Sequence, residues 1–271
     1  MRSLRILAIF SLGLAALAAG YASGAQEEPQ LTVEQQKEFL RTAKLVSSRV
    51  TGEGVTAPRR CTLSDGTITH DALFQSVDER RSSKEIMGRI EMNFVDSYLY
   101  NLAAYELATM LGLEKMMPVT VERELFNERG CLSWWLPAQF DELTRLDKKI
   151  LPPDPAAWNA QMSNMAVFSQ LVRDTDRNAV NVLIGPNWEL YMIDFTRAFR
   201  LDRGLDNPKV LTRCGRELLD KLRTLTPEDV TARTKRYLRP PEIKGVMARR
   251  DRIVAHFEAL IAAKGEAAVL Y

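Results

Sequence analysis

Residues 171–199, LVRDTDRNAVNVLIGPNWELYMIDFTRAF, decide the fold of this chain. Asp176 precedes Asn181 by five positions, and Asp194 follows after two short apolar runs. The turn Gly185-Pro186-Asn187 between these runs predicts a β-hairpin. Because a hairpin folds back on itself, we expect its two ends to bring Asp176, Asn181 and Asp194 close together.

Two carboxylates and an amide at one place suit phosphoryl transfer. An acidic group orients the attacking hydroxyl, and hard oxygen ligands hold the Mg²⁺ that neutralises the phosphates. The alternative is a hairpin whose Asp and Asn side chains only cap turns, as these residues often do. Spacing alone does not decide between the two interpretations.

Three segments together resemble the atypical kinases, namely the phosphatidylinositol 3- and 4-kinases, the HipA-type kinases and the secreted Golgi casein-kinase lineage. Asp176-Arg177-Asn178 stands where these families have Asp-Arg-His or a variant, and Asp194-Phe195-Thr196 stands in place of their Asp-Phe-Gly turn. Residues 93–123, NFVDSYLYNLAAYELATMLGLEKMMPVTVER, are similar to the long helix of their N-lobe and the strand after it. Residues 132–138, LSWWLPA, stand where their hinge binds adenine. The resemblance covers roughly residues 50–200 and is most specific in the first of these segments.

The resemblance implies an α+β, two-lobed protein-kinase-like fold. A small β-rich N-lobe with one long helix would span residues 26–137, and a mostly helical C-lobe would span residues 138–271. The order of predicted elements, strands with one helix and then helices around a short hairpin, agrees with that division.

The resemblance also implies roles for individual residues. Asp176 would be the catalytic base or hydroxyl-orienting group, Asn181 and Asp194 would ligate one or two Mg²⁺ or Mn²⁺ ions, and ATP would be the phosphate donor. Arg177 is expected to brace the loop. The residues expected beside the bound nucleotide are Gln75, Trp135, Leu136 and Ala138.

One position departs from the pattern of these families. Their nucleotide-phosphate lysine is expected near the end of the third strand, where this chain has Ala72-Leu73-Phe74-Gln75. The helix residue that would pair with Gln75 is Asn101, with Glu106 as the alternative. An amide pair is self-consistent because each amide donates and accepts, but it brings no cation to the phosphates. The side chains that could replace that cation are Arg80, Arg81, Lys84 and Arg89, and no GxGxxG loop occurs.

The remaining N-terminal half predicts a mixture of helices and strands. Residues 31–47 form an amphipathic pattern, with Thr32 as N-cap and Gln35 completing a capping box. The two runs around Asp65-Gly66 predict a β-hairpin. Residues 79–90 are charged and irregular, and residues 93–113 have helical periodicity.

The rest of the pattern is simpler. Strands are predicted over residues 117–124 and 132–136, helices over residues 158–171 and from residue 214 to the end. Trp134 and Trp135 should point to opposite faces of their strand, so one is expected in the core. Met116 and Met117 are also expected in the core. Arg197 and Arg200 are expected either to contact a phosphate group or to form ordinary salt bridges.

The first 25 residues have the layout of a secretory signal peptide. Arg2 and Arg5 precede an apolar run, and small residues precede a cleavage site after Ala25. An uncleaved N-terminal anchor is the alternative. Removing this segment leaves 35 basic and 35 acidic residues, since the full chain has 37 and 35. A neutral chain gives no electrostatic indication of nucleic-acid binding. No later stretch is apolar for long enough to span a membrane.

These observations predict an exported protein of a bacterial-type cell, periplasmic or extracellular, that transfers phosphate from ATP to a hydroxyl of an unidentified protein or small molecule. A pseudokinase that binds a nucleotide or a partner without catalysis is the alternative, favoured by Gln75. Transfer of a nucleotidyl group is a third interpretation. Cys61, Cys131 and Cys214 allow one disulfide in an oxidising compartment, and the sequence does not indicate which pair would form it.

Overall fold

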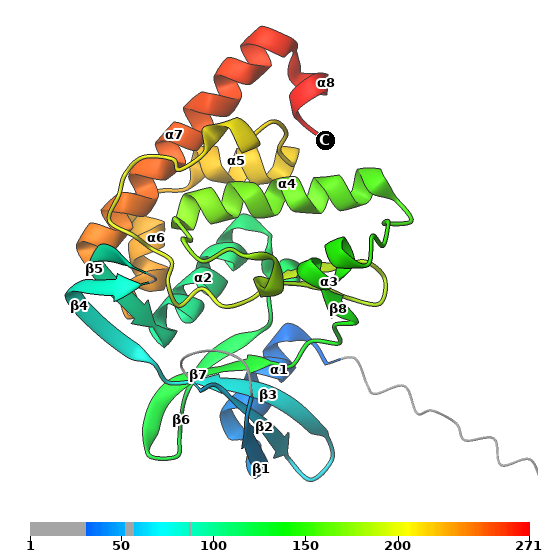
Figure 1. Ribbon diagram of the computed structural model, residues 1–271, viewed down its shortest axis with the longest axis vertical. Coiled ribbons are helices and arrows are strands. Elements are labelled where there is room, and N and C mark those ends of the chain that lie inside the picture. Colours follow the sequence, from blue (N-terminus) through cyan, green and yellow to red (C-terminus); the bar gives the residue numbers. More distant parts are fainter. Residues whose placement is uncertain (1–30, 52–56, 87) are drawn as a thin grey trace, which may run out of the picture. The chain divides into compact units, whose positions relative to one another are not determined.

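A computed structural model describes residues 31–51, 57–86 and 88–271. The predicted signal peptide lies outside the described residues. Residues 32–271 form one structural unit, in which an N-terminal antiparallel sheet is followed by helices, so the chain is α+β (Figure 1). The sheet has the strand order β1 (Lys44–Val50), β2 (Arg59–Ser64), β3 (Thr69–Gln75), β7 (Glu128–Trp134) and β6 (Thr120–Leu125).

The first helix, α1 (Val33–Thr42), is shorter than predicted. Its start is as expected, because Thr32 and Gln35 form a capping box. The prediction that it continues to residue 47 is wrong, since β1 begins at Lys44. Arg123 of β6 donates to the carbonyls of Leu40 and Ala43, each at 2.6 Å, and so satisfies two of the helix's terminal acceptors.

The charged segment predicted to be irregular forms a hairpin of β4 (Asp78–Ile86) and β5 (Arg89–Ser97). This prediction was wrong because β4, with the sequence DERRSSKEI, lacks the alternation of apolar and polar residues that marks a half-buried strand. The hairpin forms a separate two-stranded sheet, and Lys84 donates to Glu79 along it. The helix predicted from residue 93 therefore begins only at Tyr98, where the Ser97 hydroxyl caps it.

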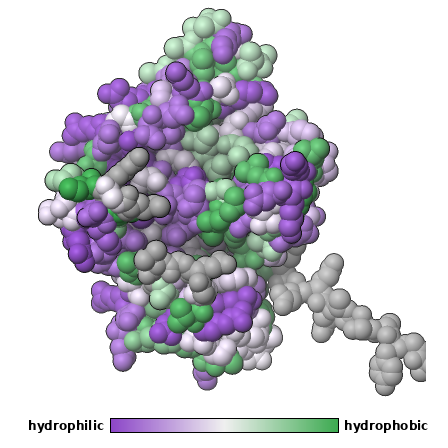
Figure 2. Space-filling view, in the orientation of Figure 1, coloured by the Kyte–Doolittle hydropathy of each residue, from purple (hydrophilic) through white to green (hydrophobic). Residues whose placement is uncertain are grey.

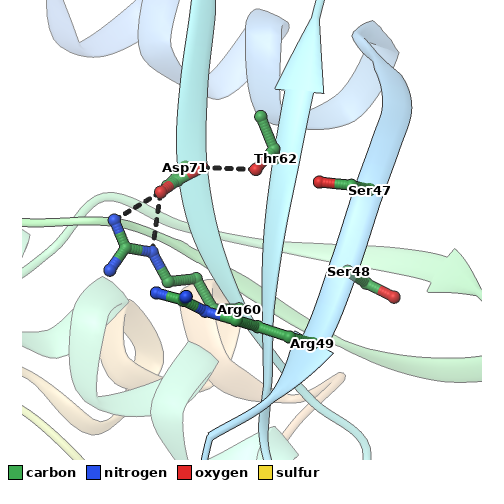
Figure 3. A pocket seen from close by; sticks show the side chains of 6 residues that line it. All are labelled: Ser47, Ser48, Arg49, Arg60, Thr62 and Asp71. Carbon is green, nitrogen blue, oxygen red and sulfur yellow. Dashed lines mark hydrogen bonds and ion pairs between the residues drawn. The ribbon is translucent and has the colours of Figure 1, made fainter.

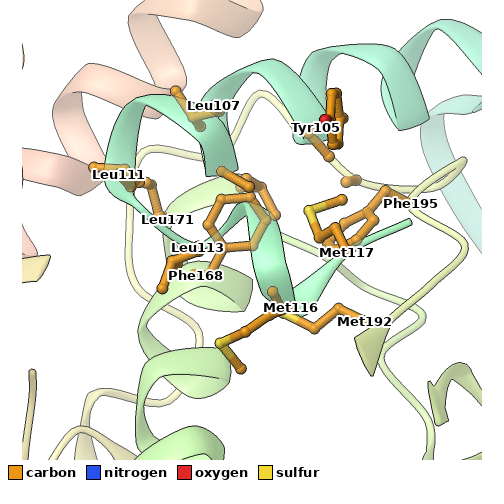
Figure 4. Packing of buried hydrophobic residues seen from close by; sticks show 14 of the residues in the cluster. Tyr105, Leu107, Leu111, Leu113, Met116, Met117, Phe168, Leu171, Met192 and Phe195 are labelled. Carbon is orange, nitrogen blue, oxygen red and sulfur yellow. The ribbon is translucent and has the colours of Figure 1, made fainter. Parts of the chain in front are cut away.

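The central helix α2 (Tyr98–Leu111) is buried along most of its length and ends at Gly112, which adopts a φ of 74°. It packs into the main hydrophobic core with α4 (Pro155–Val172) (Figure 4). Met116 and Met117 lie in this core, as the sequence indicated. Each such side chain stabilises the fold by about 1.5–3 kcal/mol through removal from water. Other members of the core shown in Figure 4 are Tyr105, Leu107, Leu111, Leu113, Phe168, Leu171, Met192 and Phe195.

The helical part surrounds a small second sheet of strand order β10-β9-β8. The predicted hairpin is its centre, with β9 (Val182–Ile184) antiparallel to β10 (Leu190–Met192). Pro227 and Pro240 begin helices α6 and α7 instead of interrupting them, because proline fits the first helical turn. The remaining elements are η1 (Glu114–Met116), β8 (Phe140–Asp141), α3 (Glu142–Asp147), η2 (Ala179–Asn181), η3 (Pro208–Val210), α5 (Arg216–Thr224), α6 (Pro227–Thr234), α7 (Pro240–Lys264) and α8 (Glu266–Val269).

The long helix α7 is anchored to the rest by the fully buried Arg249. Its guanidinium donates to the carbonyls of Leu171, Arg200 and Asp202, and burial lowers its pKa to about 10. None of the helices within the described ranges combines the length and apolar character that crossing a bilayer requires. Hydrophilic side chains cover much of the face shown in Figure 2, with hydrophobic ones scattered between them.

Candidate functional site

The turn at Asp194 is held from three sides. Asp194 itself has a φ of 56°, and its Oδ1 accepts from the Thr196 hydroxyl at 3.1 Å and lies 3.5 Å from Gln75 Nε2. The next residue, Phe195, is buried edge-on against Phe168, with ring centroids 5.6 Å apart. The Phe195 amide donates to Asn101 Oδ1 at 2.7 Å. The carboxylate of Asp194 is therefore presented on a turn that is fixed to both β3 and α2.

Gln75 and Asn101 form the amide pair expected from the sequence. Asn101 Nδ2 donates to Gln75 Oε1 at 2.9 Å, and both side chains are buried. The side-chain nitrogen of Asn101 thus donates to Gln75 on β3, and its side-chain oxygen accepts from the backbone of the Asp194 turn. Neither a lysine nor a glutamate could do both, because a lysine only donates and an ionised glutamate only accepts. The alternative partner, Glu106, instead pairs with Arg233 of α6 at 2.7 Å.

The candidate replacement cations are engaged elsewhere. Arg80 lies 3.2 Å from Glu242 of α7, and Arg81 pairs with Glu79. Lys84 donates to Glu79 at 2.6 Å. The side chain of Arg89 lies outside the described part of the chain. The Gln75 position is thus neutral, and these pairs direct Arg80 and Arg81 away from it.

Arg177 braces the loop that carries Asp176, as predicted. Its Nη1 donates to the carbonyls of Asn181 and Ile193, both at 2.7 Å. Its Nη2 lies 2.5 Å from Asp174, and its guanidinium lies 4.3 Å from the centroid of Phe195. One arginine therefore joins the loop before the hairpin to the strand that leads into the Asp194 turn.

Asp174 was missed by sequence reasoning, although it lies at helical spacing from Arg177. Its side chain is fully buried. Burial raises the pKa of this carboxyl, although the neighbouring Arg177 cation acts in the opposite direction. A carboxylate this deep needs its ion pair, so its role is to hold Arg177 in place.

Asp176 and Asn181 lie on opposite sides of a short turn. Asn181 Nδ2 donates to the Asp176 carbonyl at 2.9 Å, so the amide oxygen is the atom left to act as a metal ligand. The amide of Ile193, which precedes Asp194, donates to the Asn181 carbonyl at 3.1 Å. The carboxylate of Asp176 is 40% exposed and lies 4.0 Å from Arg197. The structure thus brings Asn181 next to the Asp194 turn and leaves Asp176 open to an incoming group.

A second carboxylate near Asp194 was not predicted. Asp96 ends β5 beside the turn, where the Ser97 amide donates to the Thr196 carbonyl at 2.9 Å. Its Oδ1 is buried without a hydrogen-bond partner. Burial raises the pKa of Asp96, and the nearby Asp194 carboxylate raises it further, while the Thr196 hydroxyl opposes both.

The donor set carried by the segments around this turn is of the chemical type that a divalent cation prefers. It comprises the Asp194 carboxylate, the Asn181 amide oxygen and the unpartnered oxygen of Asp96, all hard ligands. No trio drawn only from His, Cys, Asp and Glu is grouped for a metal among the described residues. The set therefore depends on the amide of Asn181.

The sheet face that carries Gln75 also bounds a cavity of about 240 Å³ (Figure 3). Asp71 lies four residues before Gln75 on β3 and so points to the same side. It lies 2.5 Å from Arg60 and accepts from Thr62 at 2.7 Å. The residues that line this cavity are Ser47, Ser48, Arg49, Arg60, Thr62 and Asp71. The wall is polar and charged.

The residues expected beside adenine lie at the edge of this face. Trp135 donates its backbone N–H to the Asp71 carbonyl at 3.1 Å, and the Arg60 guanidinium lies 4.0 Å from the centroid of its ring. Trp134 points the other way and packs edge-on against Phe39, as alternation predicts. Leu136 is half-buried, Ala138 is exposed, and the Ala138 amide donates to the Leu136 carbonyl at 2.8 Å. Arg60 therefore covers part of the ring that was expected to face the base.

The three cysteines are buried, free thiols. Burial raises the pKa of Cys61 to about 11 and those of Cys131 and Cys214 to about 12. They are protonated at neutral pH, which makes them poor nucleophiles. Cys131 lies 3.5 Å from Asn101 Nδ2 and so borders the amide pair.

Comparisons with known proteins identify the fold. No family model matches the sequence, and no curated protein matches it. A structure of hydra Fam20 with sugar superposes with a TM-score of 0.66 at 14% identity, over 88% of this chain and 92% of that one. The Golgi casein kinase with Mn/ADP bound superposes with a TM-score of 0.63 at 12% identity, over 88% of this chain and 78% of that one. The Helicobacter pylori proinflammatory kinase CtkA superposes with a TM-score of 0.51 at 11% identity, over 83% of this chain and 98% of that one.

These likenesses establish that the chain has an atypical kinase-like fold. At such low identity they show the fold alone, because one fold hosts many functions. The activity has to be argued from the site itself.

Proposed function

We propose that this protein is an exported, atypical kinase-like phosphotransferase that binds ATP with Mg²⁺ or Mn²⁺ and transfers phosphate to a hydroxyl of a protein or small molecule. The observation that carries the proposal is the linkage of the Asp194 turn to both Asn101 and the Arg177-braced loop. On a kinase-like fold, that linkage supports roles for the Asp194 carboxylate and the Asn181 amide as metal ligands and for the partly exposed Asp176 as the group that meets the acceptor. The Golgi casein kinase, whose structure holds Mn and ADP, supports the choice of ligands.

Each residue would have a distinct task. Asp176 would accept a hydrogen bond from the acceptor hydroxyl, orient it and take its proton. Arg197, 4.0 Å away, would help to hold the Asp176 carboxylate in place. Asn181 and Asp194, with Asp96, would hold the divalent ion, which when bound neutralises the phosphate charge. Gln75 can donate a hydrogen bond to a phosphate oxygen but brings no positive charge.

The division into lobes and the export are part of the same proposal. Residues 26–137 would form the N-lobe and residues 138–271 the C-lobe, with the polar cavity on the Gln75 face bounding the cleft between them. Residues 1–25 would direct the chain out of the cytoplasm. The mass and N-terminal sequence of the protein recovered from the periplasm or medium test the export: a chain beginning at Gln26 supports it, and an intact Met1 in a cytoplasmic fraction contradicts it.

Transfer is tested with ATP labelled at the γ- or the α-phosphate. The protein is incubated with Mn²⁺ and fractionated extracts of its own compartment. Label moving from the γ-position to an acceptor, and lost in Asp176→Asn, supports phosphoryl transfer. Label moving only from the α-position supports nucleotidyl transfer instead.

A pseudokinase is the second candidate, and two observations favour it. The buried Gln75–Asn101 pair satisfies itself without a nucleotide, and Arg60 lies over the Trp135 ring. A thermal-shift series with ATP, ADP, GTP and UTP, each with and without Mn²⁺, separates the candidates. A metal-dependent shift without transfer supports a nucleotide-binding pseudokinase, and the lack of any shift supports a scaffold that binds no nucleotide.

A further inference from the structure

A second cavity, of about 320 Å³, lies apart from the one in Figure 3 and is bounded by different elements. Its walls come from the β4–β5 hairpin, the start of α2, the segment after the Asp194 turn and the start of α7. Its lining residues are Arg80, Arg81, Ser82, Asn93, Phe94, Val95, Tyr100, Phe199, Arg200, Leu201, Arg239 and Glu242. Neither Gln75 nor Asp194 is among them.

Four guanidinium groups and a single carboxylate line this cavity. The guanidiniums belong to Arg80, Arg81, Arg200 and Arg239, which come from three separate parts of the chain, since Arg80 and Arg81 are neighbours on β4. Arg81 and Arg239 are the outer pair, with side chains 62% and 54% exposed. Arg80 and Arg200 lie deeper, and burial lowers the pKa of Arg200.

Three of the carboxylates around the cavity are each shared by two cations. Glu242 is fully buried and lies 3.2 Å from Arg80 and 2.7 Å from Arg239, and it also accepts from the Tyr100 hydroxyl at 2.6 Å. Glu91 pairs with both Arg197 and Arg200, and Glu79 pairs with both Arg81 and Lys84. A fourth carboxylate, Asp78, lies 3.7 Å from Arg80.

This sharing leaves hydrogen-bond donors in excess. Each guanidinium carries five N–H donors in a fixed planar fork, and a carboxylate offers two oxygens. Each of the three shared carboxylates serves two cations, so it cannot satisfy both of its partners in the bidentate manner. An anion with several acceptor oxygens would remove this imbalance.

We propose that the cavity between the β4–β5 hairpin and α7 binds a phosphate monoester. The tetrahedral dianion suits converging arginine forks better than a carboxylate does, because it offers three strong acceptor oxygens and up to two negative charges. The volume equals that of about ten waters at ~30 Å³ each, which leaves room for the group attached to the phosphate. That group is either a small molecule, such as a sugar, or a phosphorylated side chain.

The site is independent of the proposed activity, since its walls do not include the metal turn. It joins three segments through Arg80, Arg81, Arg200 and Arg239, so a bound phosphate should hold those segments together. Binding therefore raises the unfolding temperature as the ligand concentration rises above Kd.

Calorimetric titration of the whole protein, without nucleotide or divalent metal and at low salt, tests the site. The probes are inorganic phosphate, glucose 6-phosphate and N-acetyl-phosphoserine amide, which separate a free phosphate, a small-molecule source and a side-chain source. The variants are Arg81→Gln/Arg239→Gln, which removes the outer guanidiniums, and Arg81→Gln alone. The matched control is Arg236→Gln, an exposed arginine paired with Glu122 just before α7.

We expect saturable binding of at least one phosphate monoester to the unaltered protein, weakened at least tenfold in the double variant. Arg236→Gln and Asp194→Asn should bind as the unaltered protein does. If the double variant proves unfolded by circular dichroism, Arg81→Gln alone decides, because Glu79 keeps Lys84 as its partner. The lack of saturable binding, undiminished binding in a folded variant, or loss of binding in Asp194→Asn each overturns the proposal.

Discussion

The two sides of the candidate site differ in how closely they follow the kinase pattern. On the metal side, Asp176, Asn181 and the Asp194 turn are all present, and Arg177 ties them together. On the nucleotide side, an amide pair replaces an ion pair, and Arg60 and Asp71 make the wall polar. The comparison teaches that the half of the site proposed to bind metal keeps the kinase pattern, whereas the half proposed to bind the base departs from it, and the two halves belong to different elements.

The metal side should be the more costly one to disturb. Arg177→Met removes the cation that pairs with the fully buried Asp174, together with two hydrogen bonds to carbonyls. Stranding a buried charge typically costs about 3–5 kcal/mol. We expect a loss of that size in urea unfolding.

Arg145→Met provides the matched comparison, because Arg145 also pairs with an acidic residue three positions before it, Glu142, but at the start of α3. A loss for Arg177→Met below about 1 kcal/mol, which is typical of surface pairs, would show that the loop does not depend on its brace.

Restoring an ion pair on the nucleotide side should strengthen nucleotide binding. Gln75→Lys/Asn101→Glu replaces the amide pair with the charges that kinases use, and a charged hydrogen bond to phosphate is stronger than a neutral one by roughly 1 kcal/mol. We expect Kd for ADP with Mn²⁺ to fall between fivefold and tenfold in calorimetry.

The single variant Gln75→Lys serves as the control, since it places a cation next to Asp194 without its helix partner. An unchanged Kd in the double variant would indicate that the phosphates do not approach Gln75.

Removing the arginine that covers Trp135 should have a smaller effect on stability. Arg60 and Asp71 are both partly exposed, and pairs of this kind contribute about 0–1 kcal/mol. The free energy of unfolding of Arg60→Met should therefore lie within about 1 kcal/mol of that of the unaltered protein. Because the substitution uncovers the Trp135 ring, it should also strengthen binding of adenine nucleotides a few-fold, measured by fluorescence of that tryptophan. Weaker binding would mean that Arg60 contacts the nucleotide itself.

The contribution of Asp96 to the stability of the fold can be measured from the way stability changes with pH. Because its pKa is raised in the folded protein, the folded state holds this proton more tightly than the unfolded chain does, and ionised Asp96 opposes folding. Its contribution is favourable below the unfolded pKa and is lost as pH rises through the folded pKa.

Asp96→Asn should therefore raise the unfolding temperature slightly at pH 7 without metal, and much less at pH 4. The same variant should weaken Mn²⁺ binding several-fold. A lower unfolding temperature at pH 7 would contradict the assignment of Asp96 as an unpaired carboxylate.

The sequence predicts the local parts of this molecule well. The β9–β10 hairpin, the capping box at Thr32 and the brace at Arg177 all depend on residues a few positions apart. The Gln75–Asn101 pair spans 26 residues and was reachable only through the family resemblance.

The missed features depend on contacts with distant residues. Arg123 ends α1 from about 80 positions away. Arg60 meets Trp135 only because β7 pairs with β3 and β3 with β2. Strand β4 has charged side chains on both faces, so it shows no hydrophobic period. Asp96 was missed with the β4–β5 hairpin, since its place beside Asp194 follows from where that hairpin ends.

The most direct measurement is calorimetric titration of ADP with Mn²⁺ into Asp194→Ala and Asp176→Asn side by side. The account predicts that Asp194→Ala stays folded and loses metal-dependent binding, because a principal ligand is removed. Asp176→Asn should bind within about twofold of the unaltered protein, because its task is to orient the acceptor, and twofold is only ~0.4 kcal/mol. Unchanged metal-dependent binding in a folded Asp194→Ala would contradict the account.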